Sequence, residues 1–440
     1  MTNNDRIQPY SANPFYWQYK GQPVLLLGGS VEDNLFQIKD ITSQLDQLQA
    51  AGGNYVRCTM SSRDAGDAWP FEQEALTDLY DLNQPGQDYW GRFAHFLQLA
   101  TERDIILQIE LWDRFDYARG PWLDNPYNPK NNIHYTSKES GLPIRCDSHP
   151  SQRESCFFRT VPSLENNELL LRFQHAQVDK LLELALPYGN VLYCIDNETN
   201  EDPAWPEYWT RYLKYRANEA GVSIYVTEMW DAWDLNDPMH EATFAHPELY
   251  DFVDVSQNNH NPPDHHWQNL LDRRQKIAAS GYVRPMNNVK IYGANTGRYG
   301  TNRDAQERMW RNVFAGLASS RFHRPPSGQG LNPVAQAHLR ALRMITDEMN
   351  IFACTPHNDL LSNHSTNEAF CTANPVFFPD GGNILLDASA ISGNMLTIRW
   401  LDIRANHWLG GDSAPHVDNG LLHLVTPEEE GYWAVLVQTM

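Results

Sequence analysis

The residues with the clearest potential for chemistry are Asn197 and Glu198, which follow the apolar run at residues 191–196. A carboxylate at the end of a buried strand is costly unless it is paired, hydrogen-bonded or used in a reaction. In a (β/α)8 barrel, the catalytic groups lie at the C-terminal ends of the strands. The position of Glu198 therefore predicts a catalytic carboxylate, and an ion pair with Arg57 is the structural alternative.

Other polar and aromatic side chains follow further apolar runs, where further barrel strands are expected to end. Such a mixture suits a sugar, because hydroxyl groups need polar partners and the C–H faces of the ring stack on indole. The predicted sugar-binding residues are Arg57, Asn197, Trp112, Asp113, Trp230, Asn259, His260, Arg298 and Arg321. Trp112, Trp230 and Trp233 are the candidates for stacking, and core packing explains each of them equally well.

The elements that would position these residues are short apolar runs separated by helical segments, a pattern that is typical of βα units around a parallel sheet. The expected strands are residues 24–27, 54–60, 105–112, 191–196, 223–227, 252–257, 289–292 and 312–319. We therefore predict an α/β fold, with a (β/α)8 TIM barrel as the catalytic domain at residues 1–353. Short alternating strands separated by Gly, Asp and Asn predict a small C-terminal β-sandwich at residues 354–440.

Composition limits the class of partner. The 440 residues carry a formal net charge of -21, which argues against a nucleic acid or an anionic membrane. No apolar run approaches the roughly 20 residues that span a bilayer. We expect a carbohydrate partner, either an oligosaccharide or a polysaccharide. No metal-ligand spacing or phosphate-binding loop is evident, so we expect no metal and no cofactor.

The cysteines bear on the cellular compartment. Cys146 and Cys156 flank one loop, and Cys354 and Cys371 flank another. An exported enzyme with two disulfides would show this arrangement, although reduced thiols explain it nearly as well. We expect a secreted or periplasmic protein whose signal peptide is not part of this sequence, with the cytoplasm as the alternative.

A family resemblance adds to this interpretation. Asn197-Glu198 after an apolar fourth strand, Arg57 on the second strand and a β-sandwich after the barrel resemble clan A glycoside hydrolases. More narrowly, residues 13–30, 310–322 and 398–404 are similar to the apiosidase-like, DUF4038-type branch with its C-terminal collagen-binding-type β-sandwich. The resemblance implies a retaining glycosidase in which Glu198 is the acid/base. It also implies that Arg57 steadies a nucleophilic glutamate at the end of strand seven.

The seventh strand departs from this pattern, because Ala294 stands where the glutamate is expected. Three interpretations are open: an engineered Glu-to-Ala replacement, a natural pseudoenzyme that binds glycans without cleaving them, or a misplaced strand count in which Glu228 is the second carboxylate. We predict a retaining glycoside hydrolase of plant or algal polysaccharides or their oligosaccharides, present here as a nucleophile-dead, inactive variant, with the pseudoenzyme as the alternative. A polysaccharide lyase would instead need an anionic uronic substrate and a Tyr, His or Lys base.

Overall fold

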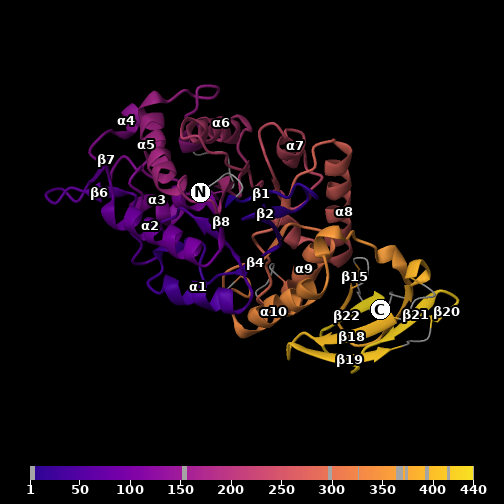
Figure 1. Cartoon of the computed structure of the whole chain (residues 1–440). Helices are drawn as coiled ribbons and strands as arrows, with labels where there is room; N and C mark the ends of the chain where they lie inside the picture. Colours follow the sequence, from indigo (N-terminus) through magenta and orange to yellow (C-terminus); the bar gives the residue numbers. More distant parts are fainter. Residues whose placement is uncertain are drawn as a thin grey trace.

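The computed structural model describes residues 5–150, 156–295, 300–325, 327–362, 370–371, 375–391, 396–413 and 417–439. A larger α/β part contains the N-terminus, and a smaller β part beside α9 and α10 contains the C-terminus (Figure 1). The protein is an α/β chain that consists of a (β/α)8 barrel followed by a small β-sandwich.

Eight parallel strands form the centre of the described barrel. They are β4 (Leu26–Gly29), β5 (Tyr55–Thr59), β8 (Ile106–Asp113), β9 (Val191–Asn197), β10 (Val226–Thr227), β11 (Val253–Asp254), β12 (Met286–Asn287) and β13 (Ser319–Phe322). Six of them make one sheet in the order β10-β9-β8-β5-β4-β13, and β11 pairs with β12. Two backbone hydrogen bonds join the sets: Ala318 N donates to Met286 O at 2.8 Å, and Asp251 N donates to Val226 O at 2.9 Å. The ring of strands is therefore closed.

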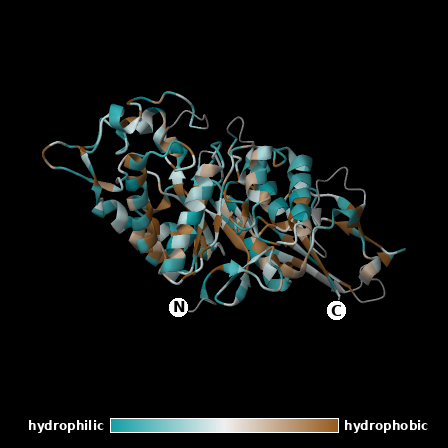
Figure 2. Cartoon of the chain, turned by 90° about the horizontal axis from the view of Figure 1, so that it is seen from above, coloured by the Kyte–Doolittle hydropathy of each residue, from teal (hydrophilic) through white to brown (hydrophobic). Residues whose placement is uncertain are grey.

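Helices follow the strands and cover the outside of the ring, as Figure 1 shows. They are α1 (Ile41–Ala50), α2 (Gln87–Glu102), α5 (Glu168–Ala185), α6 (Ala204–Glu219), α7 (Pro238–Phe244), α8 (Pro263–Ala279), α9 (Asn302–Phe314) and α10 (Pro333–Glu348). In α5, Leu170, Phe173 and Leu181 share the buried face, and the side chain of Asn167 caps the first turn by accepting from Leu170 N. Figure 2 shows the same division, with hydrophobic strands inside and hydrophilic outer helix faces.

Smaller elements close the two ends of the barrel. The antiparallel strands β1 (Gln8–Pro9), β2 (Trp17–Tyr19) and β3 (Gln22–Val24) precede the barrel, and Trp17 Nε1 donates to Asn287 Oδ1 at 2.9 Å inside the ring. The loops after β5 and β8 contain the hairpin β6 (Phe71–Gln73) and β7 (Tyr80–Pro85) and the short helices α3 (Arg119–Asp124) and α4 (Ser137–Ser140). The second loop has its own aromatic packing, in which Tyr117 stacks on Phe157 at 4.0 Å.

Two antiparallel sheets form the C-terminal part. One contains β14 (Leu361–Ser362), β17 (Asn383–Asp387), β21 (Leu421–Val425) and β20 (Val417–Asp418); the other contains β15 (Phe370–Cys371), β16 (Pro375–Phe378), β22 (Trp433–Thr439), β18 (Leu396–Asp402) and β19 (His407–Ser413). Side chains from both sheets make a separate hydrophobic cluster. This part packs on the barrel through Trp310 and Phe377, whose rings stack at 4.8 Å, and through the ion pair of Arg303 with Asp380 at 2.6 Å.

Two local expectations differ from the structure. The eighth strand is not at residues 312–319: α9 continues to Phe314, and β13 begins at Ser319. A short apolar run does not distinguish a strand from a buried helix, and α9 is buried on all sides from Ala305 to Phe314. Cys146, Cys156 and Cys354 are free thiols, so the expected pairs are not formed. In the described part of the chain, no helix is long and apolar enough to cross a membrane.

Candidate functional site

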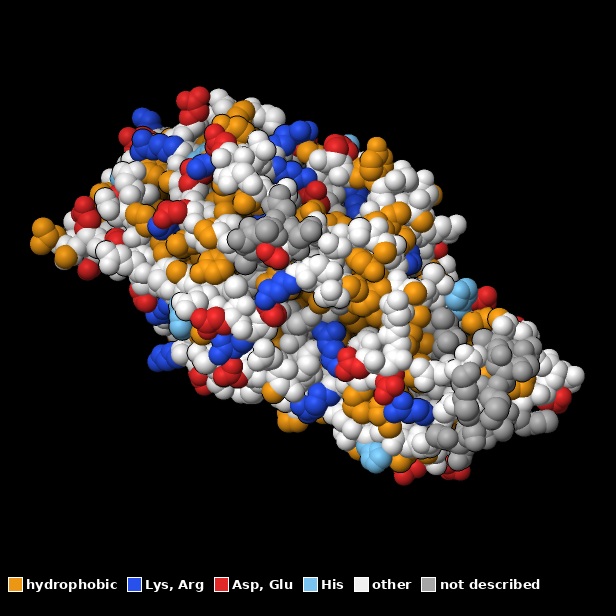
Figure 3. All heavy atoms as spheres, in the orientation of Figure 1, with side chains coloured by type: hydrophobic (Ala, Val, Ile, Leu, Met, Phe, Trp, Pro, Cys, Tyr) orange, Lys and Arg blue, Asp and Glu red, His pale blue; other side chains and the backbone are white. Residues whose placement is uncertain are grey.

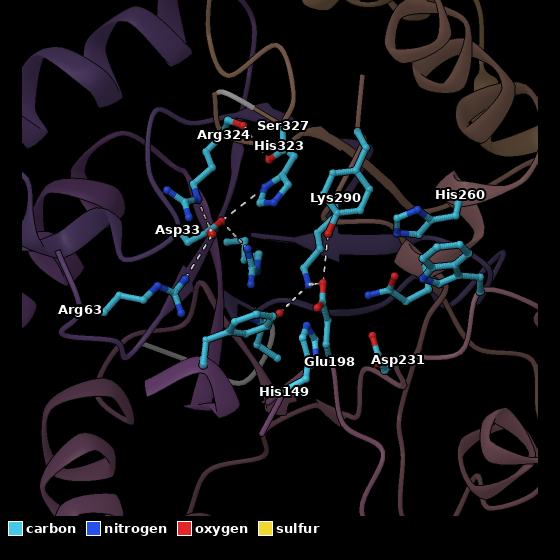
Figure 4. Close-up of a pocket in the computed structure, with 16 residues that line it drawn as sticks. Asp33, Arg63, His149, Glu198, Asp231, His260, Lys290, His323, Arg324 and Ser327 are labelled. Atoms are coloured by element: carbon cyan, nitrogen blue, oxygen red, sulfur yellow. Dashed lines mark hydrogen bonds and ion pairs between the residues drawn. The ribbon is translucent and has the colours of Figure 1, made fainter. Parts of the chain in front are cut away.

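A cavity of about 390 Å³ opens at the carboxyl ends of the barrel strands, within the size range of small-ligand pockets. Its lining is strongly polar and comes from nearly every strand end. The charged and titratable lining residues are Asp33, Glu198, Asp231, Arg57, Arg63, Lys290, Arg324, His149, His260 and His323. Figure 4 shows the labelled side chains, among them Asp33, Glu198 and His260, around the cavity.

Glu198 is held by two groups from the seventh strand segment. Lys290 Nζ donates to Glu198 Oε1 at 2.5 Å and to Asn197 Oδ1 at 2.5 Å, and the Tyr292 hydroxyl donates to the same Glu198 oxygen at 3.0 Å. The Glu198 side chain is 16% exposed. Its backbone has a φ of 59°, which is uncommon for a residue other than glycine and is often found at functional sites.

The charge state of Glu198 follows from this contact. Burial alone would raise the pKa of Glu198, but the ammonium group of Lys290 and its hydrogen bond lower that pKa from 4.5 to about 2. Glu198 is therefore a carboxylate at neutral pH. In this form it can accept a proton or attack a carbon atom, whereas proton donation would first require the Lys290 contact to be broken.

A second ion-pair cluster surrounds Asp33 on the opposite wall. Arg57 Nη1 lies 2.5 Å from Asp33 Oδ1, and Arg324 Nε lies 2.7 Å from Asp33 Oδ2. Arg63 Nη2 and His323 Nδ1 lie at 3.6 and 3.4 Å from the carboxylate. Burial would raise the pKa of Asp33, but Arg57 and these other groups hold it well below its usual range. Arg57 pairs with Asp33 and with Glu110 at 2.6 Å, whereas Lys290 is the ion-pair partner of Glu198.

His260, which lies across the cavity from Asp33 in Figure 4, forms an aromatic platform with Trp233. The rings of Trp233 and His260 stack at 4.1 Å with an angle of 13° between their planes, and His260 also contacts Tyr292 at 4.9 Å. Trp233 is 47% exposed, which is unusual for an indole. An exposed flat ring in a polar pocket is the kind of surface on which a sugar ring stacks.

The pocket brings together five of the sequence-predicted residues, namely Arg57, Asn197, Glu198, Trp233 and His260. Trp112 and Trp230 are each 1% exposed and do not line it. Trp112 packs against Trp209 at 5.6 Å in the core, and Trp230 Nε1 donates to Thr243 Oγ1 at 2.6 Å. Core packing therefore accounts for these two indoles.

Three other predicted residues support the pocket from behind. Asp113 accepts a hydrogen bond from Arg63. Asn259 Nδ2 donates to the carbonyl of Lys290 at 2.6 Å, and Arg321 Nη1 donates to the carbonyl of Val289 at 2.6 Å. The contacts of Asn259 and Arg321 fix the backbone that carries Lys290. The remaining prediction, Arg298, lies outside the described residues.

The two candidates for a second catalytic carboxylate at Glu228 and Ala294 both lie outside the pocket lining. Glu228 is fully buried and accepts a hydrogen bond from Asp196 N at 3.2 Å; burial, with the neighbouring carboxylate of Asp196, raises its pKa well above the usual range. Ala294 is half-buried, and its N–H donates to the carbonyl of Gly300 at 3.3 Å. From the seventh segment, Lys290 and Tyr292 reach the pocket instead.

The sequence-based prediction missed Asp33, Lys290 and Tyr292, although a signal for each was present. Lys290 and Tyr292 are two residues apart on an expected strand, so they share the face that Glu198 meets. Asp33 follows the first strand, where a barrel strand end predicts function. No metal-binding group of three or more His, Cys, Asp or Glu side chains occurs among the residues that the structure describes.

Comparisons with known proteins reveal similarity in three dimensions only. No protein-family model and no curated protein matches the sequence. A glycoside hydrolase family 5 protein from Bacteroides vulgatus ATCC 8482 superposes with a TM-score of 0.64 at 13% identity, covering 99% of this chain and 94% of that one. A family 5 mannosidase from Rhizomucor miehei gives a TM-score of 0.54 at 12% identity, covering 79% and 100%. A mutant of that mannosidase in complex with mannosyl-fructose gives 0.52 at 12% identity, covering 79% and 99%. At these identities the likeness shows a shared fold.

Proposed function

We propose that this protein is a glycoside hydrolase that binds an oligosaccharide or polysaccharide in the strand-end pocket and uses Glu198 as a reacting carboxylate. The carrying observation is a largely buried, ionised carboxylate at the end of β9, in a pocket with an exposed indole platform. The fold shared with family 5 glycoside hydrolases supports the proposal. The apiosidase-like resemblance of the sequence and its plant or algal substrates remain part of the same hypothesis.

Glycoside cleavage needs one carboxyl group that protonates the departing oxygen and a second that stabilises or attacks the anomeric carbon. Because Lys290 keeps Glu198 ionised, we assign Glu198 the second role in a retaining reaction. Both Asp33 oxygens are engaged by arginines. We assign the proton-donor role to Asp231, the other carboxyl group that lines the pocket. This reverses the acid/base role that the family resemblance implies for Glu198.

The test compares E198Q and D231N with the unchanged protein on a panel of polysaccharides and activated aryl glycosides. We expect E198Q to lose roughly 10³-fold or more on every substrate, because no attacking carboxylate remains. D231N should lose roughly 10²- to 10⁴-fold on polysaccharides but retain activity on aryl glycosides whose leaving group needs no proton. E183Q, at an exposed ion pair on α5, is the control. Full activity of E198Q would refute the proposal.

Position 294 gives an independent test of the engineered-variant hypothesis. Because Ala294 lies outside the pocket lining, we expect A294E to leave hydrolysis unchanged. A gain of roughly 100-fold or more in cleavage would show that the missing nucleophile belongs at this position.

A non-catalytic glycan-binding protein is the second candidate. The observation that favours it is the Lys290–Glu198 ion pair, because an ammonium group occupies the carboxylate that would otherwise react. Tight glycan binding without any turnover by the unchanged protein would support this candidate. Products that absorb in the ultraviolet would instead indicate a lyase.

A further inference from the structure

We infer that the sugar accepted by this pocket carries an anionic group, a carboxylate or a sulfate, which binds on the arginine wall beside Asp33. The inference deepens the proposed function and rests on it only in treating the pocket as a glycan site. Four Lys or Arg and three Asp or Glu side chains line the pocket, whereas the whole chain has 34 Lys or Arg and 55 Asp or Glu. On the face of the molecule drawn in Figure 3, acidic and basic side chains are intermixed.

The pocket carboxylates with described partners are already neutralised by the protein itself. Asp33 has Arg57 on one oxygen and Arg324 on the other, and Glu198 has Lys290 on Oε1. Charge-assisted hydrogen bonds of this kind are stronger than those from the hydroxyl groups of a neutral sugar. Three of the four oxygens of these two carboxylates therefore already have a charged partner from the protein.

Hydrogen-bond donors, by contrast, remain. Arg324 contacts Asp33 through Nε and donates to Glu32 through Nη1. None of its described contacts involves Nη2. Arg57 Nη2 is fully buried and has no hydrogen-bond partner within the described structure. An unmet guanidinium donor is costly when buried, and a planar carboxylate or a sulfate is the acceptor that guanidinium geometry matches.

The Arg324 donor is reachable from the cavity, whereas the Arg57 side chain is fully buried behind it. Arg324 is 27% exposed and Arg63 is 14% exposed at their side chains, and both line the cavity. His260, on which Trp233 stacks, lies across the cavity from Arg324 and Asp33 in Figure 4, so one ligand can place a ring face on the indole and an anionic substituent near the arginines. A molecule with a pyranose or furanose ring and a negative charge is an acidic sugar.

The experiment measures affinities of the full chain for matched ligands by titration calorimetry. Uronate oligosaccharides are compared with their methyl esters, which remove the charge from the same sugar, and sulfated oligosaccharides are compared with desulfated ones. We expect at least one acid to bind tenfold or more tightly than its neutral form, with the advantage falling as salt rises toward 1 M. The arm with the larger ratio identifies carboxylate or sulfate as the group recognised.

A variant pair locates the charge contact. R324Q should weaken binding of the anionic ligand about tenfold and leave binding of its neutral form unchanged, whereas R211Q, at an exposed pair on α6, should change neither. If R324Q does not fold, the salt dependence of the unchanged protein still tests whether the charge of the ligand contributes to binding.

Each outcome separates the two proposals. Equal or tighter binding of the neutral forms would overturn the anionic-sugar inference and leave the hydrolase proposal standing. Anionic sugars that bind in this way but are never cleaved would support the inference and overturn the hydrolase proposal. Binding of no sugar of either kind would overturn both.

Discussion

Replacement of Lys290 by methionine tests the electrostatic account of the pocket most directly. Methionine has a similar length and keeps the apolar stem, but it removes the ammonium group that lies 2.5 Å from Glu198 Oε1. In the unchanged protein, this ammonium group overcomes the burial that would otherwise raise the pKa of Glu198. We expect the pKa of Glu198 in K290M to lie above 4.5.

The size of the effect follows from the structure. The interval between 4.5 and about 2 corresponds to about 3 kcal/mol in favour of the charged form of Glu198. A carboxyl whose pKa is lowered on folding stabilises the folded state above its unfolded pKa, and this stability is lost as pH falls through the folded value. The unchanged protein should therefore lose about 3 kcal/mol of this contribution between pH 4.5 and about 2. K290M should lack that loss.

The assay is a carbon-13 NMR titration of labelled glutamate side chains, with E198Q to assign the Glu198 signal. Urea unfolding at a series of pH values measures the accompanying stability change. A Glu198 pKa that stayed near 2 in K290M would refute the reasoning, because it would show that other groups keep the carboxylate ionised. K276M, which removes a partly exposed lysine paired with Glu241, is the matched control and should leave the Glu198 signal unchanged.

Two further predictions concern stability and binding. Burial, against the opposing charge of Arg114, raises the pKa of Asp196 from 3.8 to about 7, so its contribution to folding is present below about pH 4 and is lost as pH rises toward 7. Thermal denaturation from pH 4 to 8 should show this fall in the unchanged protein and a shallower one in D196N; identical slopes would contradict it. W233A should weaken glycan binding roughly tenfold at unchanged melting temperature, and W230A should cost about 3–5 kcal/mol of stability. Calorimetry measures binding and urea unfolding measures stability. A loss of stability in W233A without a loss of binding, or the reverse in W230A, would contradict the distinction between platform and core.

The barrel was predictable from sequence because its strands are short apolar runs at regular spacing. The run before Glu198 shows why: all seven residues of β9 are buried, so an apolar run and a barrel strand coincide. The eighth strand could not be located in this way, because the apolar run at residues 313–318 contains the end of α9 and the turn before β13, which begins only at Ser319. A short apolar run does not show where a helix ends and a strand begins.

The candidate site was predictable in part. Arg57, Glu198 and His260, which the strand ends nominated, line the pocket. The spacing of residues along the sequence does not show whether a side chain ends in the core or in the pocket. Trp230 and Trp233 are three residues apart, but only Trp233 reaches the cavity. Ion-pair partners are equally hidden, because Lys290 and Glu198 are 92 residues apart in the chain.

The Asp33 cluster bears on the order in which the protein is made. Its cations include Arg57 on β5 and Arg324 after β13. Arg324 also donates a hydrogen bond to Glu32, from which it is 292 positions distant in sequence. The seam between β4 and β13 joins the first strand of the ring to the last. During synthesis on the ribosome, Asp33 emerges long before Arg324, so this wall of the pocket forms only when the ring closes. Long-range pairing of this kind is intrinsically slow, so this wall should add to the time that the barrel needs to fold.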